Sequence, residues 1–261
     1  MTLSYLCQQG ISYFAGDNQN GSSKNSCAEK DFSSFAIHGG AQYKPLSAFV
    51  PSDFSSAAFP SLAAVISASV YGGNFSKTEL LGLDYNDFQG DKIFFDILKQ
   101  CGASVEWGEK KVTVGGGELH GAVFDLNDTP DLLPVCAVLA AYCSGETRLI
   151  NVAHARIKET DRIKVMCSEL KKLGVDIAEL PDGLVIKGGN KITGGTVDGH
   201  GDHRVVMALS VCALGATAPV TILGAEAADV TYPEFLGLIK MPNRSIALFA
   251  KYNLQACCIQ T

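Results

Sequence analysis

A pattern of residues that recurs about every 70 positions sets the strongest limit on what this chain can fold into. Gly102 and Gly174, which are 72 residues apart, each end a segment with helical alternation of apolar and polar residues. Asp53, Asp131 and Asp202, which are 78 and 71 residues apart, each stand at the start of an apolar segment. Repeated units of this kind bury their apolar faces against one another, so we expect three units that share one core.

Each unit predicts the same order of elements: a strand, an apolar helix, a strand, an amphipathic helix and two further strands. The first helices, expected at 53–69, 130–145 and 201–216, are apolar on nearly every face, which is typical of buried helices. The amphipathic helices are expected to lie on the surface. The third unit is expected to be cut short after TYPEFLGLIK, at residue 240. The chain is therefore predicted to be an α/β (α+β) protein built from repeated βαβαββ units.

The segment before the repeat gives local signals only. Residues 1–11 predict a short helix that stops at a glycine. Residues 15–34 are rich in Gly, Ser and Asn and predict a loop, and residues 35–38 predict a short strand.

The composition excludes several classes of function. The 261 residues are 47% hydrophobic and 18% charged, with a formal net charge of -6 and no cluster of Lys and Arg, which argues against nucleic acid as the main ligand. The nine cysteines form no CxxC pair, and most lie in apolar segments, which favours a reduced, cytoplasmic protein. We find no signal peptide, and the longest apolar stretches, of 10–16 residues, are too short and too interrupted to cross a bilayer.

The densest group of polar residues is RIKETDR at 156–162, where the amphipathic helix of the second unit is expected to begin. Lys158 and Arg162 are four residues apart and are expected to share one face of that helix, beside Glu159. An ordinary helix start explains the acidic residues, because carboxylates favour the positive end of the helix dipole and Thr can cap it. The same dipole disfavours cations, so the two cations favour a site for an incoming anion. Both interpretations are compatible with the sequence.

The third unit opens with Asp202, His203 and Arg204. A histidine at a helix start is more often structural than catalytic, but Arg204 leads directly into a helix that should be buried. Arg204 should therefore face a cleft or a carboxylate. In the second unit Asp131 follows a proline suited to the first helical position, and by itself it is a routine first-turn residue. Because Asp131 and Arg204 open equivalent helices, the repeat predicts that they meet at one end of the domain.

Five segments carry a resemblance to a known family: RIKETDR, DGHGDHRVVMA at 198–208, TYPEF at 231–235, SDFSSAAF at 52–59 and FQGD at 88–91. They resemble the motifs of the EPSP synthase family of enolpyruvyl transferases, in the family's order and over roughly residues 1–240. Related transferases that act on a nucleotide sugar share the fold but lack the RxKE[ST]DR pattern.

The resemblance implies a fold of two globular lobes with the active site in the cleft between them. Residues 47–240 correspond to one of these, an inside-out α/β barrel lobe of the enolpyruvyl transferase type. Residues 1–46 are then expected to be a remnant of the first lobe, and residues 241–261 a tail with no counterpart in the family.

The resemblance also implies the reaction, which is transfer of the enolpyruvyl group from phosphoenolpyruvate to the 5-hydroxyl of shikimate 3-phosphate, by addition and then loss of phosphate. No metal or organic cofactor is implied. Asp131 would take the proton from the attacking hydroxyl. Glu159 and Lys158 would handle proton transfer at the methylene carbon and the departing phosphate.

Four further residues would bind the substrates. Arg162 and Arg204 would hold the carboxylate and phosphate of phosphoenolpyruvate through paired hydrogen bonds. His203 would support this group, and His154 stands where a polar residue lines the site in relatives.

Two departures from the family leave the interpretation open. The family has a lysine just before its [ST][FY]P triplet, where this chain has Val230, and its first lobe supplies further cations. One interpretation is half of a split transferase that works with a separate first-lobe chain. A second is a truncated, non-catalytic homologue that retains anion binding, and a third is a binding module for another ligand. An uncovered cleft face also predicts self-association. In every case the expected ligands are small molecules, with neither nucleic acid nor membrane as a partner.

Overall fold

The chain divides into two compact units, Met1–Pro51 with Asn86–Gln89, and Ser52–Tyr85 with Gly90–Thr261. The computed structural model describes residues 2–11, 13–15, 34–37, 39–43, 50–71 and 77–239. The predicted boundary between residues 46 and 47 and the predicted tail at 241–261 lie outside the described residues, so both stay predictions.

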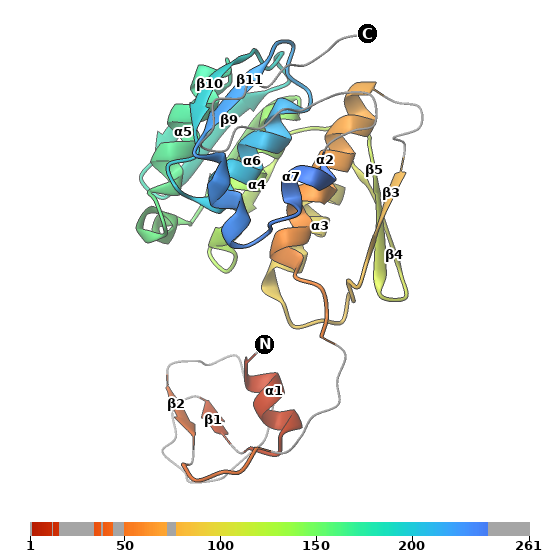
Figure 1. Ribbon diagram of the computed structural model, residues 1–261, viewed down its shortest axis with the longest axis vertical. Coiled ribbons are helices and arrows are strands. Elements are labelled where there is room, and N and C mark those ends of the chain that lie inside the picture. Colours follow the sequence, from red (N-terminus) through yellow and green to blue (C-terminus); the bar gives the residue numbers. More distant parts are fainter. Residues whose placement is uncertain are drawn as a thin grey trace. The chain divides into compact units, whose positions relative to one another are not determined.

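The smaller unit contains helix α1 (Thr2–Gln8) and the antiparallel strands β1 (Tyr13–Ala15) and β2 (Phe35–Ile37) (Figure 1). Leu6, Ile11 and Tyr13 form its small apolar cluster. The helix predicted within 1–11 is confirmed, and so is the strand predicted at 35–38, apart from its last residue, which is not described. The predicted loop at 15–34 falls mostly outside the described residues, and its first residue ends β1.

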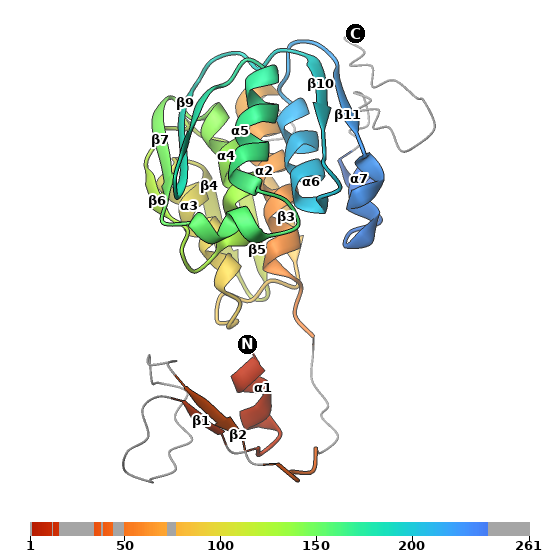
Figure 2. The same cartoon turned by 90° about the vertical axis from the view of Figure 1, so that its left-hand side faces the viewer.

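Three apolar helices form the centre of the larger unit: α2 (Phe54–Tyr71), α4 (Leu133–Tyr142) and α6 (His203–Ala213). They lie side by side and roughly parallel, each in contact with the other two (Figures 1 and 2). Their residues are mostly Ala, Val, Leu and Ser, and most are buried. The prediction of three buried helices is confirmed.

By length and composition alone, α2 could cross a membrane. However, 56% of the apolar stretch is buried inside the unit, as is usual for the core helix of a globular domain.

The second unit of the repeat has every predicted element. Helix α4 lies between two strands, the amphipathic helix α5 (Arg162–Lys172) follows, and two more strands close the unit. The sheet order is β6-β7-β9-β8, with β6 parallel to β7 and the other pairs antiparallel. The strands are β6 (Val123–Asp125), β7 (Gly145–Ile150), β8 (Asp176–Leu180) and β9 (Gly183–Gly188).

The first and third units show parts of the same order. In the first, α3 (Ile93–Gln100) precedes two strands of a sheet ordered β3-β5-β4. In the third, β10 precedes α6 in the sequence and β11 follows it, and the two strands pair in parallel. Strands β6 and β7 do the same before and after α4. The remaining bounds are β3 (Lys77–Leu81), β4 (Ser104–Gly108), β5 (Lys111–Gly115), β10 (Gly195–Asp198), β11 (Val220–Leu223) and α7 (Phe235–Leu238).

Two glycines fix the length of the outer helices. Gly102 (φ 101°) and Gly174 (φ 82°) follow α3 and α5 in the left-handed region, where a residue with Cβ is strained. The amides that follow turn back into the helices: Ala103 N donates to Leu98 O at 3.0 Å, and Val175 N to Leu170 O at 3.1 Å. The 72-residue spacing noticed in the sequence is therefore the spacing of two equivalent helix ends.

The sheets and outer helices surround the apolar helices, which is the reverse of a barrel with strands inside (Figure 2). The predicted fold, an inside-out α/β barrel lobe built from βαβαββ units, is confirmed. Because α2, α4 and α6 run in the same direction, their amino-terminal ends all lie at one end of the unit (Figure 2).

Candidate active site

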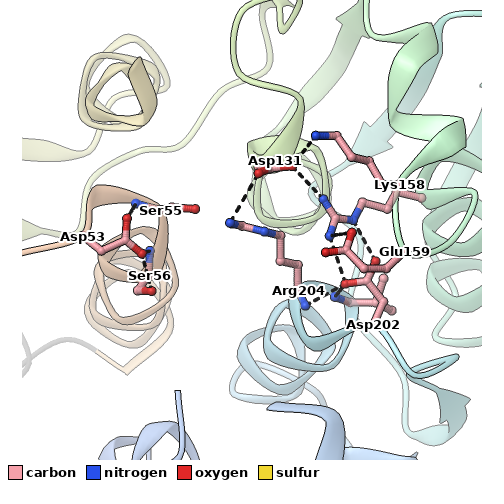
Figure 3. Close-up of polar contacts among 10 residues, drawn as sticks. Asp53, Ser55, Ser56, Asp131, Lys158, Glu159, Asp202 and Arg204 are labelled. Atoms are coloured by element: carbon pink, nitrogen blue, oxygen red, sulfur yellow. Dashed lines mark hydrogen bonds and ion pairs between the residues drawn. The ribbon is translucent and has the colours of Figure 1, made fainter. Parts of the chain in front are cut away.

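Asp131 and Arg204 meet at this end, as the repeat predicts. Asp131 lies in a single 3-10 turn, η3 (Pro130–Leu132), that leads into α4, and Arg204 lies in the first turn of α6. An Arg204 guanidinium nitrogen is 3.4 Å from Asp131 Oδ2 (Figure 3). Arg204 therefore faces a carboxylate although it opens a buried helix.

The three aspartates that open the repeats do different work. Asp53 caps α2 by accepting from the amides of Ser55 and Ser56, and Asp202 caps α6 by accepting from the amide of Arg204 at 2.9 Å (Figure 3). Asp131 lies inside η3, after the N-cap residue Thr129, and among the described residues its carboxylate contacts side-chain cations rather than backbone amides. The carboxylate of Asp131 points instead at the neighbouring cations (Figure 3).

The structure corrects the predicted helix start at 156–162. Another short 3-10 helix, η4 (Ala153–Ile157), comes first, and α5 begins only at Arg162, with Asp161 as its capping residue. Asp161 accepts a hydrogen bond from the amide of Lys164 at 3.0 Å. Lys158 and Arg162 therefore do not share a helical face. Both cations nevertheless reach the same atom, Asp131 Oδ1, at 3.2 and 2.9 Å.

Arg162 is fully buried and its guanidinium is surrounded by the protein's own carboxylates. It donates to Asp202 at 2.7 and 3.2 Å, to Asp131 at 2.9 Å and to Glu159 at 2.6 Å. Burial alone would lower the pKa of Arg162, but these acids, Asp202 foremost, raise it above its usual value. In this structure the anions beside Arg162 are therefore supplied by the protein, and an incoming anion reaches it only if one of these carboxylates turns away.

Asp131 is the carboxylate at which these cations converge. Its side chain is one-third exposed and contacts Lys158, Arg162 and Arg204. Burial raises its pKa, but Arg204 and the bond from Lys158, together with Arg162, outweigh burial and hold the pKa below the ordinary value. Asp131 is therefore ionised at neutral pH and able to accept a proton.

The charges of this cluster cancel. It contains three cations and three carboxylates: Lys158, Arg162, Arg204, Asp131, Glu159 and Asp202. His203, beside them in sequence, adds no charge at neutral pH, because burial and the charge of Arg204 lower its pKa. A multiply charged anion would therefore need cations beyond those of this cluster to balance it.

Two predicted positions lie apart from the cluster's contacts. His154 is partly buried on η4, and no hydrogen bond or ion pair of the described residues joins it to the cluster. Val230, at the position where the resemblance led us to expect a lysine, is 80% exposed at the end of the 3-10 helix η5 (Ala225–Val230).

Asp202 and Asp91 were not predicted as site residues. Asp202 is buried, and burial would raise its pKa, but the bond from Arg162 keeps it low. Asp91, from the FQGD segment, lies where burial raises its pKa and the charge of Arg204 opposes that rise. Both belong to segments already noticed, but only the fold shows that they lie near Arg162 and Arg204.

No group of three or more His, Cys, Asp or Glu side chains among the described residues is arranged to hold a metal ion. A separate groove of about 530 Å³ lies along α2, β3 and α7 and is lined mainly by apolar side chains. No residue of the charged cluster lines that groove.

Comparison with known proteins agrees with this architecture. The sequence pattern of the family EPSP synthase (3-phosphoshikimate 1-carboxyvinyltransferase) matches residues 27–239. The 3-phosphoshikimate 1-carboxyvinyltransferase of Ruminiclostridium cellulolyticum is 44% identical over 248 residues, which are 95% of this chain and 54% of that protein. The protein of the same name from Acetivibrio thermocellus is 44% identical over 239 residues, 92% of this chain and 51% of that protein.

Solved structures show the same relationship. EPSP synthase from Acinetobacter baumannii superposes with a TM-score of 0.68 at 30% identity, over 78% of this chain and 48% of that one. The enolpyruvyl transferase NikO from Streptomyces tendae superposes with a TM-score of 0.64 at 18% identity, which shows the shared fold alone. The chain spans about half the length of the curated relatives it matches. With the family pattern matched over most of its length and the fold shared, the chain belongs to the EPSP synthase family.

Proposed function

We propose that the larger unit forms one wall of an active site that transfers an enolpyruvyl (1-carboxyvinyl) group from phosphoenolpyruvate to shikimate 3-phosphate. The proposal rests on the convergence of three cations on Asp131. They meet at the end of the unit where α2, α4 and α6 begin, in a chain of the EPSP synthase family. A one-third exposed carboxylate among cations suits proton removal from a hydroxyl beside a bound anion.

The proposed reaction is an addition followed by an elimination. The 5-hydroxyl oxygen bonds to the second carbon of phosphoenolpyruvate while Asp131 accepts the hydroxyl proton. The methylene carbon gains a proton from the Lys158 ammonium and becomes a methyl group, while the Glu159 carboxylate stays paired with Arg162. Loss of a methyl proton to Glu159 or to the now neutral Lys158, together with departure of phosphate, then restores the double bond. No metal or organic cofactor takes part.

The side-chain exposures indicate which cations an incoming anion contacts first. Arg204 and Lys158 have side chains that are 16% and 32% exposed, so they meet the anion first, whereas Arg162 lies beneath them. As the phosphate and carboxylate of phosphoenolpyruvate draw these two cations away, Asp131 loses the neighbours that lower its pKa. Asp131 thus becomes a stronger base once the substrate is bound. His203 and His154 line the surrounding wall in this proposal.

Because the charges of the cluster cancel, binding of a multiply charged anion requires positive charge from another source. We propose that a first lobe, carried by a separate chain, closes over this end and supplies it, and that the reaction takes place in the cytoplasm. Among the described residues, five buried cysteines form no disulfide, which fits a reducing compartment: Cys101, Cys136, Cys143, Cys167 and Cys212. Self-association of the uncovered face is the competing arrangement.

One observation favours a second candidate function. The exposed Val230 stands where the resemblance led us to expect a lysine, and loss of one charge-assisted contact costs about 1.5–3 kcal/mol. The second candidate is therefore a non-catalytic homologue that binds anions at Arg204 and Lys158.

Complementation distinguishes the two candidates. Phosphate release from phosphoenolpyruvate and shikimate 3-phosphate is measured with the chain alone and with the purified first lobe of the Ruminiclostridium cellulolyticum relative. We expect turnover in the mixture, lost in Asp131→Asn and retained in Asp53→Asn, which changes the equivalent capping aspartate. No turnover in the mixture, with phosphoenolpyruvate still bound, would establish the non-catalytic homologue.

A further inference from the structure

Arg156 has more polar contacts than its place in the sequence suggests. It lies on η4, two residues before Lys158, and its side chain is 27% exposed. It donates twice to Asp161 (3.1 and 2.9 Å) and twice to Glu179 Oε2 (3.2 Å each). It also donates to two backbone carbonyls at the end of β8, Leu180 O at 2.7 Å and Pro181 O at 3.1 Å.

The segment that Arg156 encloses is residues 157–160, which carries Lys158 and Glu159. Outside helices and strands, no backbone–backbone hydrogen bond of the described residues involves positions 158–160. The side-chain contacts of this segment instead run inward, from Lys158 to Asp131 and from Glu159 to Arg162. Its outer side is closed by the pair of Arg156 and Asp161, five residues apart.

Asp161 joins this pair to the helix. Its carboxylate caps α5 through the amide of Lys164 while both of its oxygens accept from Arg156. Arg156 therefore fixes the first residue of α5 relative to the end of β8, and with it the direction in which Arg162 enters the cluster.

We propose that Arg156 is a positioning residue of this site, which holds the 157–160 segment against the end of β8 so that Lys158 and Glu159 face Asp131 and Arg162. The geometry calls for an arginine. A planar guanidinium with five N–H groups can serve two carboxylates and two carbonyls at once, whereas the ammonium of lysine has three donors at one point. Charge alone is therefore insufficient, and a lysine at this position is expected to release the segment.

The consequence for catalysis rests on the proposed function, but the positioning itself does not. The positioning and its consequence for catalysis can be tested separately, because the backbone order of residues 157–160 and the titration of Asp131 are measurable without substrate or turnover. Burial raises the pKa of Asp131, whereas Arg204, the bond from Lys158 and the charge of Arg162 lower it. If Lys158 leaves, the pKa of Asp131 rises.

The experiment compares Arg156→Lys with Arg148→Lys in the full chain by NMR. Arg148 supplies the matched control, because it is 43% exposed and its one ion pair among the described residues is to Glu146, at 3.4 Å. In Arg156→Lys we expect the backbone order parameters of Lys158 and Glu159 to fall from about 0.85 to below about 0.6. We also expect a higher titration midpoint for the Asp131 carboxyl. Arg148→Lys should change neither quantity.

Two results would overturn the proposal. One is a folded Arg156→Lys protein with unchanged order parameters and an unchanged Asp131 titration. The other is a loss of order spread evenly over α4 and α6, which would give Arg156 a merely structural role. If Arg156→Lys fails to fold, Glu179→Gln replaces it, since it weakens one partner of Arg156 and leaves Asp161 in place. It should give the same two changes at smaller size, and their absence would equally refute the proposal.

Discussion

Replacing Asp202 by alanine removes the most deeply buried carboxylate of the charged cluster. The side chain is 0% exposed and has two functions. It accepts two hydrogen bonds from Arg162, at 2.7 and 3.2 Å, and it caps α6 through the amides of Arg204 and Val205. The substitution therefore breaks a buried ion pair and uncaps a core helix together.

The two losses have different sizes. Removing one partner of a buried pair costs about 3–5 kcal/mol, because the other charge stays buried. Loss of a capping carboxylate costs about 1 kcal/mol. Asp131 and Glu159 still contact Arg162 in the variant, which places the ion-pair loss at the lower end of its range. We expect Asp202→Ala to lower the free energy of unfolding by about 4 kcal/mol in total.

The repeat provides the control. Asp53 caps α2 through the amides of Ser55 and Ser56, but it is exposed and has no arginine partner among the described residues. Asp53→Ala therefore removes a cap without breaking a buried ion pair, at an expected cost of about 1 kcal/mol. It also removes the exposed bond from Ser56 Oγ at 2.6 Å. Both variants are compared with the wild type by urea unfolding, followed by circular dichroism and by the fluorescence of Trp107, the single tryptophan.

The relative losses of the two variants test whether the buried ion pair stabilises the fold. If Asp202→Ala costs no more than Asp53→Ala, the buried pair adds nothing to stability. A double variant, Asp202→Ala with Arg162→Met, extends the test. It should recover part of the loss, because no charge is then left unpaired in the core.

Three further predictions concern pH, backbone and charge. The pKa values of Asp131 and Asp202 lie below the ordinary 3.8, so the stability that these ionised carboxylates give the fold is complete at neutral pH. That stability is lost as the pH falls below about 4, which the urea midpoint measured against pH would show. Gly174→Ala should cost about 1–2 kcal/mol in unfolding free energy, since φ is +82°, whereas Gly237→Ala, within α7 and with open space around it, should be neutral or slightly stabilising. Val230→Lys should raise phosphoenolpyruvate affinity about tenfold or more by calorimetry, because it adds a charge-assisted contact.

Each of these predictions has a clear contrary result. Stability that rises on acidification would mean that the two aspartates are not stabilised as anions. Equal losses at both glycines would show that backbone strain at Gly174 is relieved elsewhere. Unchanged affinity in Val230→Lys, at the ionic strength of the wild-type measurement, would place that residue outside the anion site.

The sequence predicted the architecture because the repeat left few alternatives. Three apolar segments with acidic openings required three buried helices, and the spacing of Gly102 and Gly174 located the ends of the outer helices. The spacing also predicted that Asp131 and Arg204 meet, which the 3.4 Å contact confirms. These features depend on the local pattern of residues and on the symmetry between units, and both can be recognised in the amino-acid sequence.

The arrangement within the cluster could not be predicted from the sequence. The start of α5 was placed too early, because the spacing of Lys158 and Arg162 matches a helical turn. In the structure Asp161 caps the helix and also bonds Arg156, which bonds the end of β8. The burial of Arg162 was also missed. Its main partner, Asp202, comes from the next unit of the repeat, 40 residues away, so only the packing of α5 against α6 brings the two together.

The three aspartates that open the repeats show how duplication separates stability from chemistry. In the first and third units the carboxylate secures its own helix, so losing it weakens the fold. In the second unit Asp131 lies inside η3, after the N-cap residue Thr129, and its carboxylate contacts the neighbouring cations instead of capping the helix. A substitution at Asp131 therefore removes ion pairs with Lys158, Arg162 and Arg204 but no helix cap. The same fold can therefore accept new chemistry at that position while its two copies keep the scaffold intact.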